Sequence, residues 1–217
     1  MNICNFAQDV HDNAKKHGWW DEDRSFGTIA ALIASEWSEA LEEYRAGRPA
    51  VWYACLEAPK DGMAHLCCPK DEFDCQNFEK VSICKYHSQK PEGFAVELID
   101  GCIRILDWFG REGIQIAGPN TVDKLVRQAG SVYDKMIFPD AVSWLNLYVS
   151  RAFFEYGRNG MNENKEVAQK RACLHLLEAM AIAFRLVKNS GNDPEEILQF
   201  KHEYNVTRSY KHGNKLC

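Results

Sequence analysis

Two pairs of acidic residues stand out because each pair is spaced three residues apart within a run of helical periodicity. The first pair is Glu36 and Glu39, and the second is Glu97 and Asp100. Residues three apart in an α-helix project from the same face, about one turn from each other. Each pair borders the apolar stripe of its helix, so its charges would be partly buried and costly without a positive partner. Divalent cations that prefer carboxylate oxygens are the simplest such partner.

The competing interpretation of these acids is that they are solvated charges on amphipathic helices. For a single Glu-x-x-Glu pair that is the better interpretation, but two pairs beside strongly periodic apolar stripes favour one shared metal site. Arg104 follows Asp100 by four residues and shares its helix face. It is expected either to balance the acids as an ion pair or to contact a phosphate group.

The order of these motifs resembles the metal-binding signature of the MazG-like superfamily, the all-α nucleoside-triphosphate pyrophosphohydrolases. In that family Glu-x-x-Glu is followed on a later helix by Glu-x-x-Asp. Two further segments are similar to segments of the family: His-Gly-Trp-Trp at 17–20, and Tyr-Asn-x-x-Arg-x-Tyr-Lys-His-Gly at 204–213. The resemblance covers most of the chain and departs from the family pattern at residues 50–90.

The resemblance implies an all-α helical bundle that hydrolyses a nucleoside triphosphate to the monophosphate and pyrophosphate. It implies Mg²⁺, with Mn²⁺ as a substitute, held by the four acids Glu36, Glu39, Glu97 and Asp100. Glu39, with Glu36 as second choice, is expected to accept a proton from the attacking water. It also implies a homo-oligomer, either a dimer or a tetramer.

The substrate contacts are expected to come from both ends of the chain. Trp20 is expected to stack on the nucleobase, and Asn205 to donate hydrogen bonds to the base or sugar. Arg208 and Lys211 are expected to neutralise phosphate oxygens, and Arg104 is the remaining candidate for that role.

Composition excludes several other classes of function. The 217 residues carry a net charge of −5, which argues against binding a nucleic acid polymer. No apolar run is long enough for a membrane span, and the first residues do not form a signal peptide. We therefore expect a cytoplasmic protein with no membrane partner, whose nine cysteines are thiols or metal ligands rather than disulfides.

Residues 50–90 are predicted to form an irregular, cysteine-rich insertion in the helical domain. Cys67, Cys68, Cys75 and Cys84 could supply a tetrahedral zinc site that stabilises this small segment. Their spacing lacks a Cys-x-x-Cys pair, so free thiols are the alternative.

Helical periodicity predicts a single all-α domain spanning 1–217. The expected helices are 2–17, 28–46, 94–112, 121–135, 141–156, 164–188 and 194–203. Residues 121–217 are predicted to be a degenerate second repeat with a basic tail. Aligning the two halves places Tyr148, Arg151, His175 and Glu178 at the positions of Glu36, Glu39, Glu97 and Asp100 respectively.

Two other functions are compatible with the sequence. One is a nucleotide-binding regulator that uses the same pocket without turnover. The other is a zinc-stapled interaction protein in which residues 50–90 form the working surface. Magnesium-dependent release of pyrophosphate would distinguish the enzyme from both.

Overall fold

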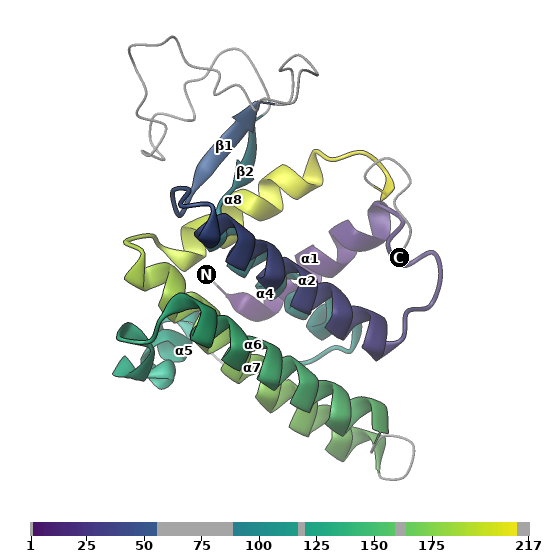
Figure 1. Ribbon diagram of the computed structural model, residues 1–217. Helices are drawn as coiled ribbons and strands as arrows, with labels where there is room; N and C mark the ends of the chain where they lie inside the picture. The colour runs from purple at the N-terminus through teal and green to yellow at the C-terminus, as the bar shows by residue number, and fades with distance from the viewer. Residues whose placement is uncertain (1, 56–88, 117–119, 159–163, 212–217) are drawn as a thin grey trace.

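The protein is described by a computed structural model that covers residues 2–55, 89–116, 120–158 and 164–211 (Figure 1). The predicted all-α fold is confirmed. The elements in chain order are α1 (Ile3–Lys16), α2 (Phe26–Arg45), β1 (Trp52–Cys55), β2 (Gln89–Glu92), α4 (Phe94–Arg111), α5 (Thr121–Ala129), the 3₁₀ turn η1 (Ser131–Asp134), α6 (Phe138–Phe153), the π-helical turn η2 (Phe154–Arg158), α7 (Lys165–Asn189) and α8 (Pro194–Val206).

Side chains that cap the first turn fix where three of these helices begin. The Asn2 side chain accepts hydrogen bonds from two backbone N–H groups of α1. Ser25 accepts one from Thr28 at the start of α2, and Asp193 accepts two at the start of α8, where Pro194 occupies the first turn. Such caps satisfy backbone donors that have no partner inside the helix. As a result, α2 begins two residues earlier than its periodicity predicted.

Helix α4 is the central element of the bundle, and α1, α2, α7 and α8 all pack against it. Two glycines on α4 allow the closest approaches. A side chain at Gly101 would collide with the Trp37 indole, and one at Gly110 would collide with the backbone of Ala7. The fit of α2 against α4 is therefore set by a large residue on one helix and the absence of a side chain on the other.

The second half of the chain forms a helix pair of its own. α6 packs against α7, and α5 packs against α7 much as α1 packs against α4. α6 also contacts α2, so the two helix pairs share one apolar core. In Figure 1, α6 and α7 lie at the opposite end of the molecule from the strands.

The predicted helix at 121–135 is wrong in its last turn. α5 ends at Ala129 because Gly130 adopts a positive φ of 69°, and the chain continues as a separate 3₁₀ turn, η1. Gly adopts this conformation without steric cost, so it ends the helix. The next helix, α6, begins at Phe138 rather than Ala141, because Pro139 suits a first turn.

The ends of the cysteine-rich segment form a short antiparallel ribbon rather than irregular chain. β1 pairs with β2 so that Trp52 lies opposite Glu92 and Cys55 lies opposite Gln89. The chain thus leaves the helical bundle and returns to it at neighbouring positions. The candidate zinc ligands Cys67, Cys68, Cys75 and Cys84 lie outside the described residues.

Within the described ranges, no helix combines the length and the apolar character needed to cross a membrane.

Candidate functional site

Three of the four predicted acids converge where α2 packs on α4. Glu36, Glu97 and Asp100 each offer a carboxylate oxygen, and these oxygens lie within 4.8 Å of one another. Glu97 is only 4% exposed, and Glu36 is also buried. The i, i+3 spacing places Glu97 and Asp100 on one face of α4, and the Trp37–Gly101 contact brings Glu36 up to them.

The electrostatics of this cluster are unfavourable for three anions. Burial and then the neighbouring Asp100 charge raise the pKa of Glu97 to about 9. Burial and then Asp100 also raise the pKa of Glu36. A carboxyl group that resists ionisation in a cavity is typical of a functional site, because buried like charges destabilise the fold.

Two cationic side chains are built into the same cluster. Both Nε and Nη2 of Arg104 contact Oε1 of Glu36, at 3.1 and 3.0 Å. The ion-pair interpretation of Arg104 is thereby confirmed. Lys201, from α8, places its Nζ 2.7 Å from Oδ2 of Asp100 and is only 1% exposed. Its Nζ also lies 3.4 Å from the carbonyl oxygen of Pro91, at the base of the ribbon.

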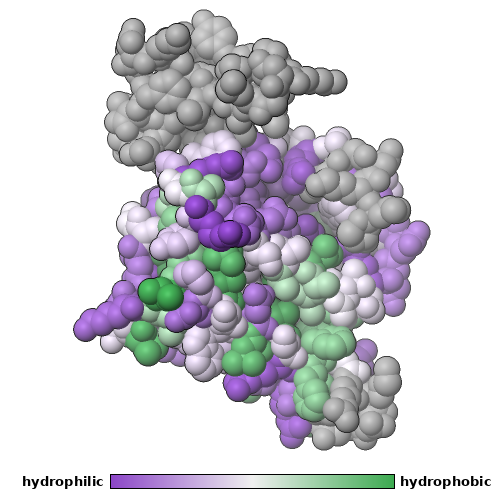
Figure 2. Space-filling model, in the orientation of Figure 1, coloured by the Kyte–Doolittle hydropathy of each residue, from purple (hydrophilic) through white to green (hydrophobic). Residues whose placement is uncertain are grey.

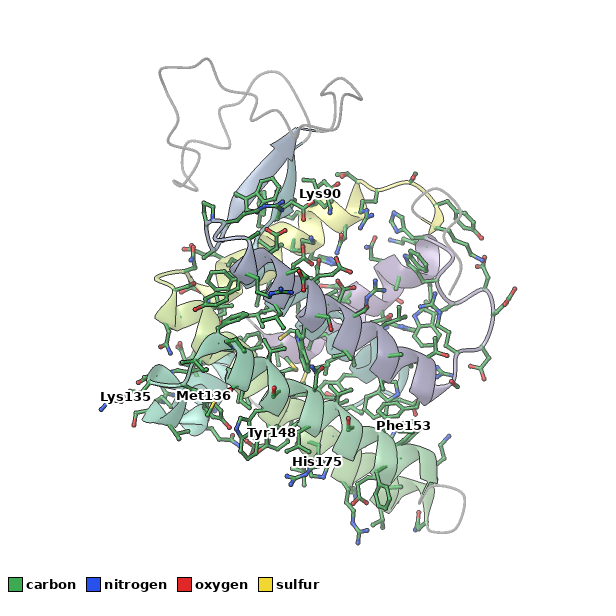
Figure 3. The ribbon with its side chains drawn as sticks, in the orientation of Figure 1. Lys90, Lys135, Met136, Tyr148, Phe153 and His175 are labelled. Carbon is green, nitrogen blue, oxygen red and sulfur yellow. The ribbon has the colours of Figure 1, made fainter. Side chains whose placement is uncertain are left out.

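A cavity of about 310 Å³ opens beside the cluster. Its walls come from α1, the loop after α1, α2, β2, α4 and α8, so segments from both ends of the chain meet there. In Figure 3, Lys90, which contributes to the wall from β2, lies beside α8. The polar and charged residues of the wall are Asn13, His17, Ser35, Glu36, Glu39, Lys90, Glu97, Asp100, Arg104, Asp107, Lys201, His202, Asn205 and Arg208.

The fourth predicted acid, Glu39, lines this cavity but stands apart from the three clustered carboxylates. Its side chain is exposed, and no ion pair engages it among the residues that the structure describes. Glu39 is therefore available to act on a molecule in the cavity, whereas Glu36 is already held by Arg104.

Two of the predicted tail residues also reach the cavity, namely Asn205 and Arg208. The Oδ1 atom of Asn205 is buried and has no hydrogen-bond partner in the described part of the chain. Nε2 of His17 lies 2.8 Å from the backbone oxygen of Arg208, which fixes the tail against α1. A buried polar atom without a partner is costly, so Asn205 is a candidate for contact with a bound molecule.

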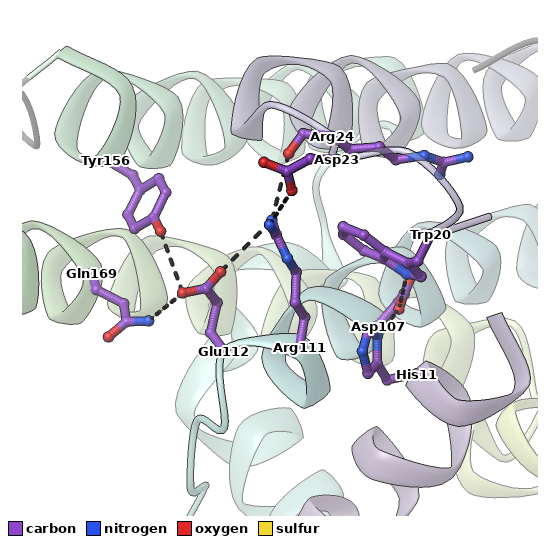
Figure 4. Close-up of polar contacts among 9 residues, drawn as sticks. All are labelled: His11, Trp20, Asp23, Arg24, Asp107, Arg111, Glu112, Tyr156 and Gln169. Carbon is purple, nitrogen blue, oxygen red and sulfur yellow. Dashed lines mark hydrogen bonds and ion pairs between the residues drawn. The ribbon is translucent and has the colours of Figure 1, made fainter. Parts of the chain in front are cut away.

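The neighbouring residues Trp19 and Trp20 have different environments. The sequence analysis predicted that Trp20 stacks on the nucleobase. The Trp20 indole donates to both carboxylate oxygens of Asp107, at 2.9 and 3.1 Å (Figure 4). Asp107 also contacts Nδ1 of His11 at 2.8 Å. Trp20 does not line the cavity, whereas the buried Trp19 does. The structure therefore places Trp19 where an aromatic wall was expected.

A second polar network holds the loop that carries these tryptophans. Arg111, at the end of α4, pairs with Asp23 in the loop and lies over the Trp20 ring, 4.7 Å from its centre. Next to it, Glu112 accepts hydrogen bonds from Tyr156 and Gln169 of the second half (Figure 4). Arg111 and Asp107 together hold the Trp20 ring outside the cavity wall.

Lys211, the last predicted phosphate contact, lies in the tail against the loop after α1 and does not line the cavity. Its Nζ is 3.5 Å from Oδ2 of Asp21, and its backbone N–H donates to the oxygen of His17. Tyr210 also bonds to Asp21. Both residues therefore fasten the tail to the loop after α1.

Sequence reasoning missed Lys201, although a signal for it was present. Lys201 follows the buried residues Ile197 and Leu198 by four and three positions, so it occupies a core-facing position of α8. A lysine at such a position needs a buried partner. The two acids on the facing helix α4 supply it.

Comparison of the chain with protein-family models, curated proteins and solved structures finds no match.

Proposed function

We propose that this protein hydrolyses a nucleoside triphosphate to the monophosphate and pyrophosphate, using Mg²⁺ held by Glu36, Glu97 and Asp100. The observation that carries the proposal is the triad of carboxylate oxygens within 4.8 Å of one another. Carboxylate oxygens are the donors that Mg²⁺ prefers, and a divalent cation would offset the burial and the neighbouring Asp100 charge, which together raise the pKa of Glu97 to about 9. The reaction itself comes from the resemblance of the acid motifs.

The cavity offers distinct contacts to the parts of such a substrate. Arg208 and Lys90 bring positive charge to its wall, suited to phosphate oxygens. Trp19 offers an aromatic surface, and Asn205 offers a buried side-chain oxygen that has no hydrogen-bond partner among the described residues. An acidic chain can therefore bind an anionic ligand, because the positive charge is local.

The chemistry divides among the residues as follows. Bound Mg²⁺ would neutralise charge on the phosphates and lower the pKa of a bound water. Arg104 holds Glu36 in place through two contacts to one carboxylate oxygen. Glu39, exposed at the cavity and outside the triad, accepts the proton of the attacking water. We assign the general base to Glu39 because Glu36 is engaged by Arg104.

The test is pyrophosphate release from a panel of ribo- and deoxyribonucleoside triphosphates, with Mg²⁺ and with EDTA. We expect metal-dependent turnover by the wild-type chain and its loss in Glu39→Gln. Glu42→Gln is the matched control, because Glu42 lies on the same helix and pairs with Arg45 at the surface. Turnover that persists in EDTA, or that survives in Glu39→Gln, would contradict the mechanism.

A non-catalytic nucleotide-binding regulator is the second candidate, and one observation favours it. Arg104 and Lys201 already neutralise Glu36 and Asp100, so the cluster has a charge-balanced arrangement that needs no metal. Nucleotide binding by calorimetry, unaffected by EDTA and without pyrophosphate release, would support this candidate instead. The zinc-stapled interaction protein depends on cysteines that lie outside the described residues.

A further inference from the structure

Asp107 is a buried acid of the cavity wall that takes no part in the proposed mechanism. It is 8% exposed and lies on α4, seven residues after Asp100 and three after Arg104. Residues at these spacings share one face of a helix, and all three line the cavity. Seven residues of α-helix rise by about 10 Å, so Asp107 stands two turns away from Asp100 along the same wall.

The cavity is charged at the end where Asp100 lies. There the Asp100 carboxylate pairs with the buried Lys201 of α8, beside the other two acids of the cluster. Figure 2 shows that hydrophilic residues gather on the half of the molecule where Figure 1 places α8 and the strands. This end suits the phosphate groups of the proposed substrate and the metal bound to them.

The cavity wall near Asp107 is apolar and aromatic. Asp107 contacts His11 of α1 and Trp20 of the loop after α1. Val10 and Trp19, each next to one of these residues in the chain, are buried and line the cavity. A flat and largely apolar group such as a nucleobase suits this end of the cavity.

The Asp107 carboxylate has hydrogen-bonding capacity beyond its contacts with the protein. Its Oδ1 atom lies 2.8 Å from Nδ1 of His11 and 2.9 Å from Nε1 of Trp20 (Figure 4). Its Oδ2 atom shares the same Trp20 N–H, at 3.1 Å. An ionised carboxylate accepts up to about four hydrogen bonds, so Oδ2 can accept another from a molecule in the cavity.

The chemistry of a carboxylate decides which base can make that contact. A carboxylate only accepts hydrogen bonds, so Asp107 needs a donor on the molecule that it binds. The exocyclic amino group of cytosine or adenine projects from the edge of the ring and supplies one. Uracil and hypoxanthine carry a carbonyl oxygen at the same position, which would face the carboxylate as a second acceptor. Among apolar neighbours such a contact is costly, because no water replaces the missing donor.

From its place beside the aromatic wall and its spare acceptor, we propose that Asp107 selects nucleotides whose base carries this amino group over those with a carbonyl group in its place. The inference rests on the proposed function, because it names the base of the same substrate. The Trp20 indole supplies a single N–H, which a neutral acceptor could bind, so anchoring Trp20 does not by itself require a carboxylate.

The test compares kcat/KM within two pairs of nucleotides, CTP with UTP and ATP with ITP. In each pair an amino group on one base is replaced by a carbonyl group on the other. The wild-type chain should prefer the amino-bearing member of each pair that it hydrolyses by about tenfold or more. Asp107→Asn keeps an oxygen for Trp20 and offers an N–H donor to the cavity, so it should shift the preference to the carbonyl-bearing member. Equal use of both members by the wild type would overturn the proposal.

Trp20→Phe is the control for a purely structural role of Asp107. It removes the indole N–H but keeps both Asp107 oxygens, so it should lower activity toward both members of a pair and leave their ratio unchanged. A ratio that shifts as much in Trp20→Phe as in Asp107→Asn would show that the effect acts through the loop, and would contradict a direct contact with the base.

Binding separates this inference from the proposed activity. Calorimetry with Glu39→Gln in Mg²⁺ measures Kd for the same four nucleotides in the absence of turnover. Tighter binding of the amino-bearing members would support the inference even if the wild-type chain released no pyrophosphate. Equal binding of both members, or binding of none of the four, would overturn it.

Discussion

The helix pairs α2–α4 and α6–α7, which the predicted repeat aligns with each other, carry different residues where they meet. In the first pair, three carboxylates share one buried cluster. In the second pair, the aligned positions bring Tyr148 and His175 together, with ring centres 6.2 Å apart (Figure 3). Arg151 lies over Tyr148, and the Glu178 carboxylate accepts a hydrogen bond from Gln128.

The α6–α7 pair shows that two helices of this bundle can pack together without a cluster of acids among their described residues. In it, Tyr148, Arg151 and Glu178 each contact a neighbour of a different kind, whereas in the first pair burial and then like charges raise the pKa values of Glu36 and Glu97. The alignment of the two halves is still a prediction. The contrast nevertheless suggests that the acids of the first pair are retained for binding rather than for folding.

The largest effect should come from exchanging one aligned acid for its amide in each pair. Asp100→Asn should lower pyrophosphate release by about a thousandfold or more, because it removes a proposed metal ligand. Glu178→Gln, at the aligned position, should keep activity within about twofold of the wild type, because its pair holds no acidic cluster. Steady-state assays at saturating Mg²⁺ measure both. Equal losses in the two variants would contradict the asymmetry between the halves.

Removal of the buried lysine should produce the largest change in stability. Lys201→Met leaves the Asp100 carboxylate without its cation, and we expect the free energy of unfolding to fall by about 3 kcal/mol in metal-free protein at neutral pH. Lys188→Met is the control, because Lys188 pairs with Asp193 at the surface. Urea denaturation followed by circular dichroism measures both. A loss no larger than that of Lys188→Met would show that Lys201 is not the counter-ion.

A smaller effect of opposite sign is expected when one buried acid is made neutral. The pKa of Glu97 rises from 4.5 to about 9 on folding, so between these pH values the folded state binds more protons than the unfolded state. Stability of the metal-free chain should therefore fall as pH rises through this window. Glu97→Gln removes that loss and should stabilise the apo protein by about 1–2 kcal/mol at pH 8, and by little at pH 5.

Thermal melts at both pH values, with and without Mg²⁺, test this prediction. Added Mg²⁺ should raise the melting temperature of the wild type by mass action and have a much smaller effect on Glu97→Gln. A variant less stable than the wild type at pH 8 in EDTA would show that Glu97 is ionised and well paired in the apo cluster.

Periodicity predicted the helices well because most of them bury one clear apolar stripe. The i, i+3 spacing also predicted the shared face of Glu97 and Asp100. Of the four acids predicted to form one site, the structure brings Glu36, Glu97 and Asp100 together and leaves Glu39 apart. The ribbon was missed, because β1 and β2 are four residues each and Pro91 lowers the strand signal.

The parts of the site that the sequence did not predict depend on contacts between segments that lie far apart in the chain. Either Trp19 or Trp20 could have faced the cavity, and the hydrogen bond from Trp20 to Asp107 decided between them. Lys211 pairs with Asp21, and helical periodicity could not predict a contact between the tail and this distant loop. Predicting the role of Lys201 would have required knowing that α8 packs on α4.

The ribbon has a consequence for how this protein tolerates change in length. Because Cys55 and Gln89 lie opposite each other, residues 56–88 form a closed side branch whose two ends are already held together. Even for a fully flexible chain, doubling the length of such a branch would add only about 0.6 kcal/mol of loop-closure entropy. Insertions and deletions between these strands are thus inexpensive. Yet the strand that closes the branch supplies Lys90 to the cavity and the Pro91 carbonyl to Lys201, so any sequence inserted there would lie close to the acidic cluster.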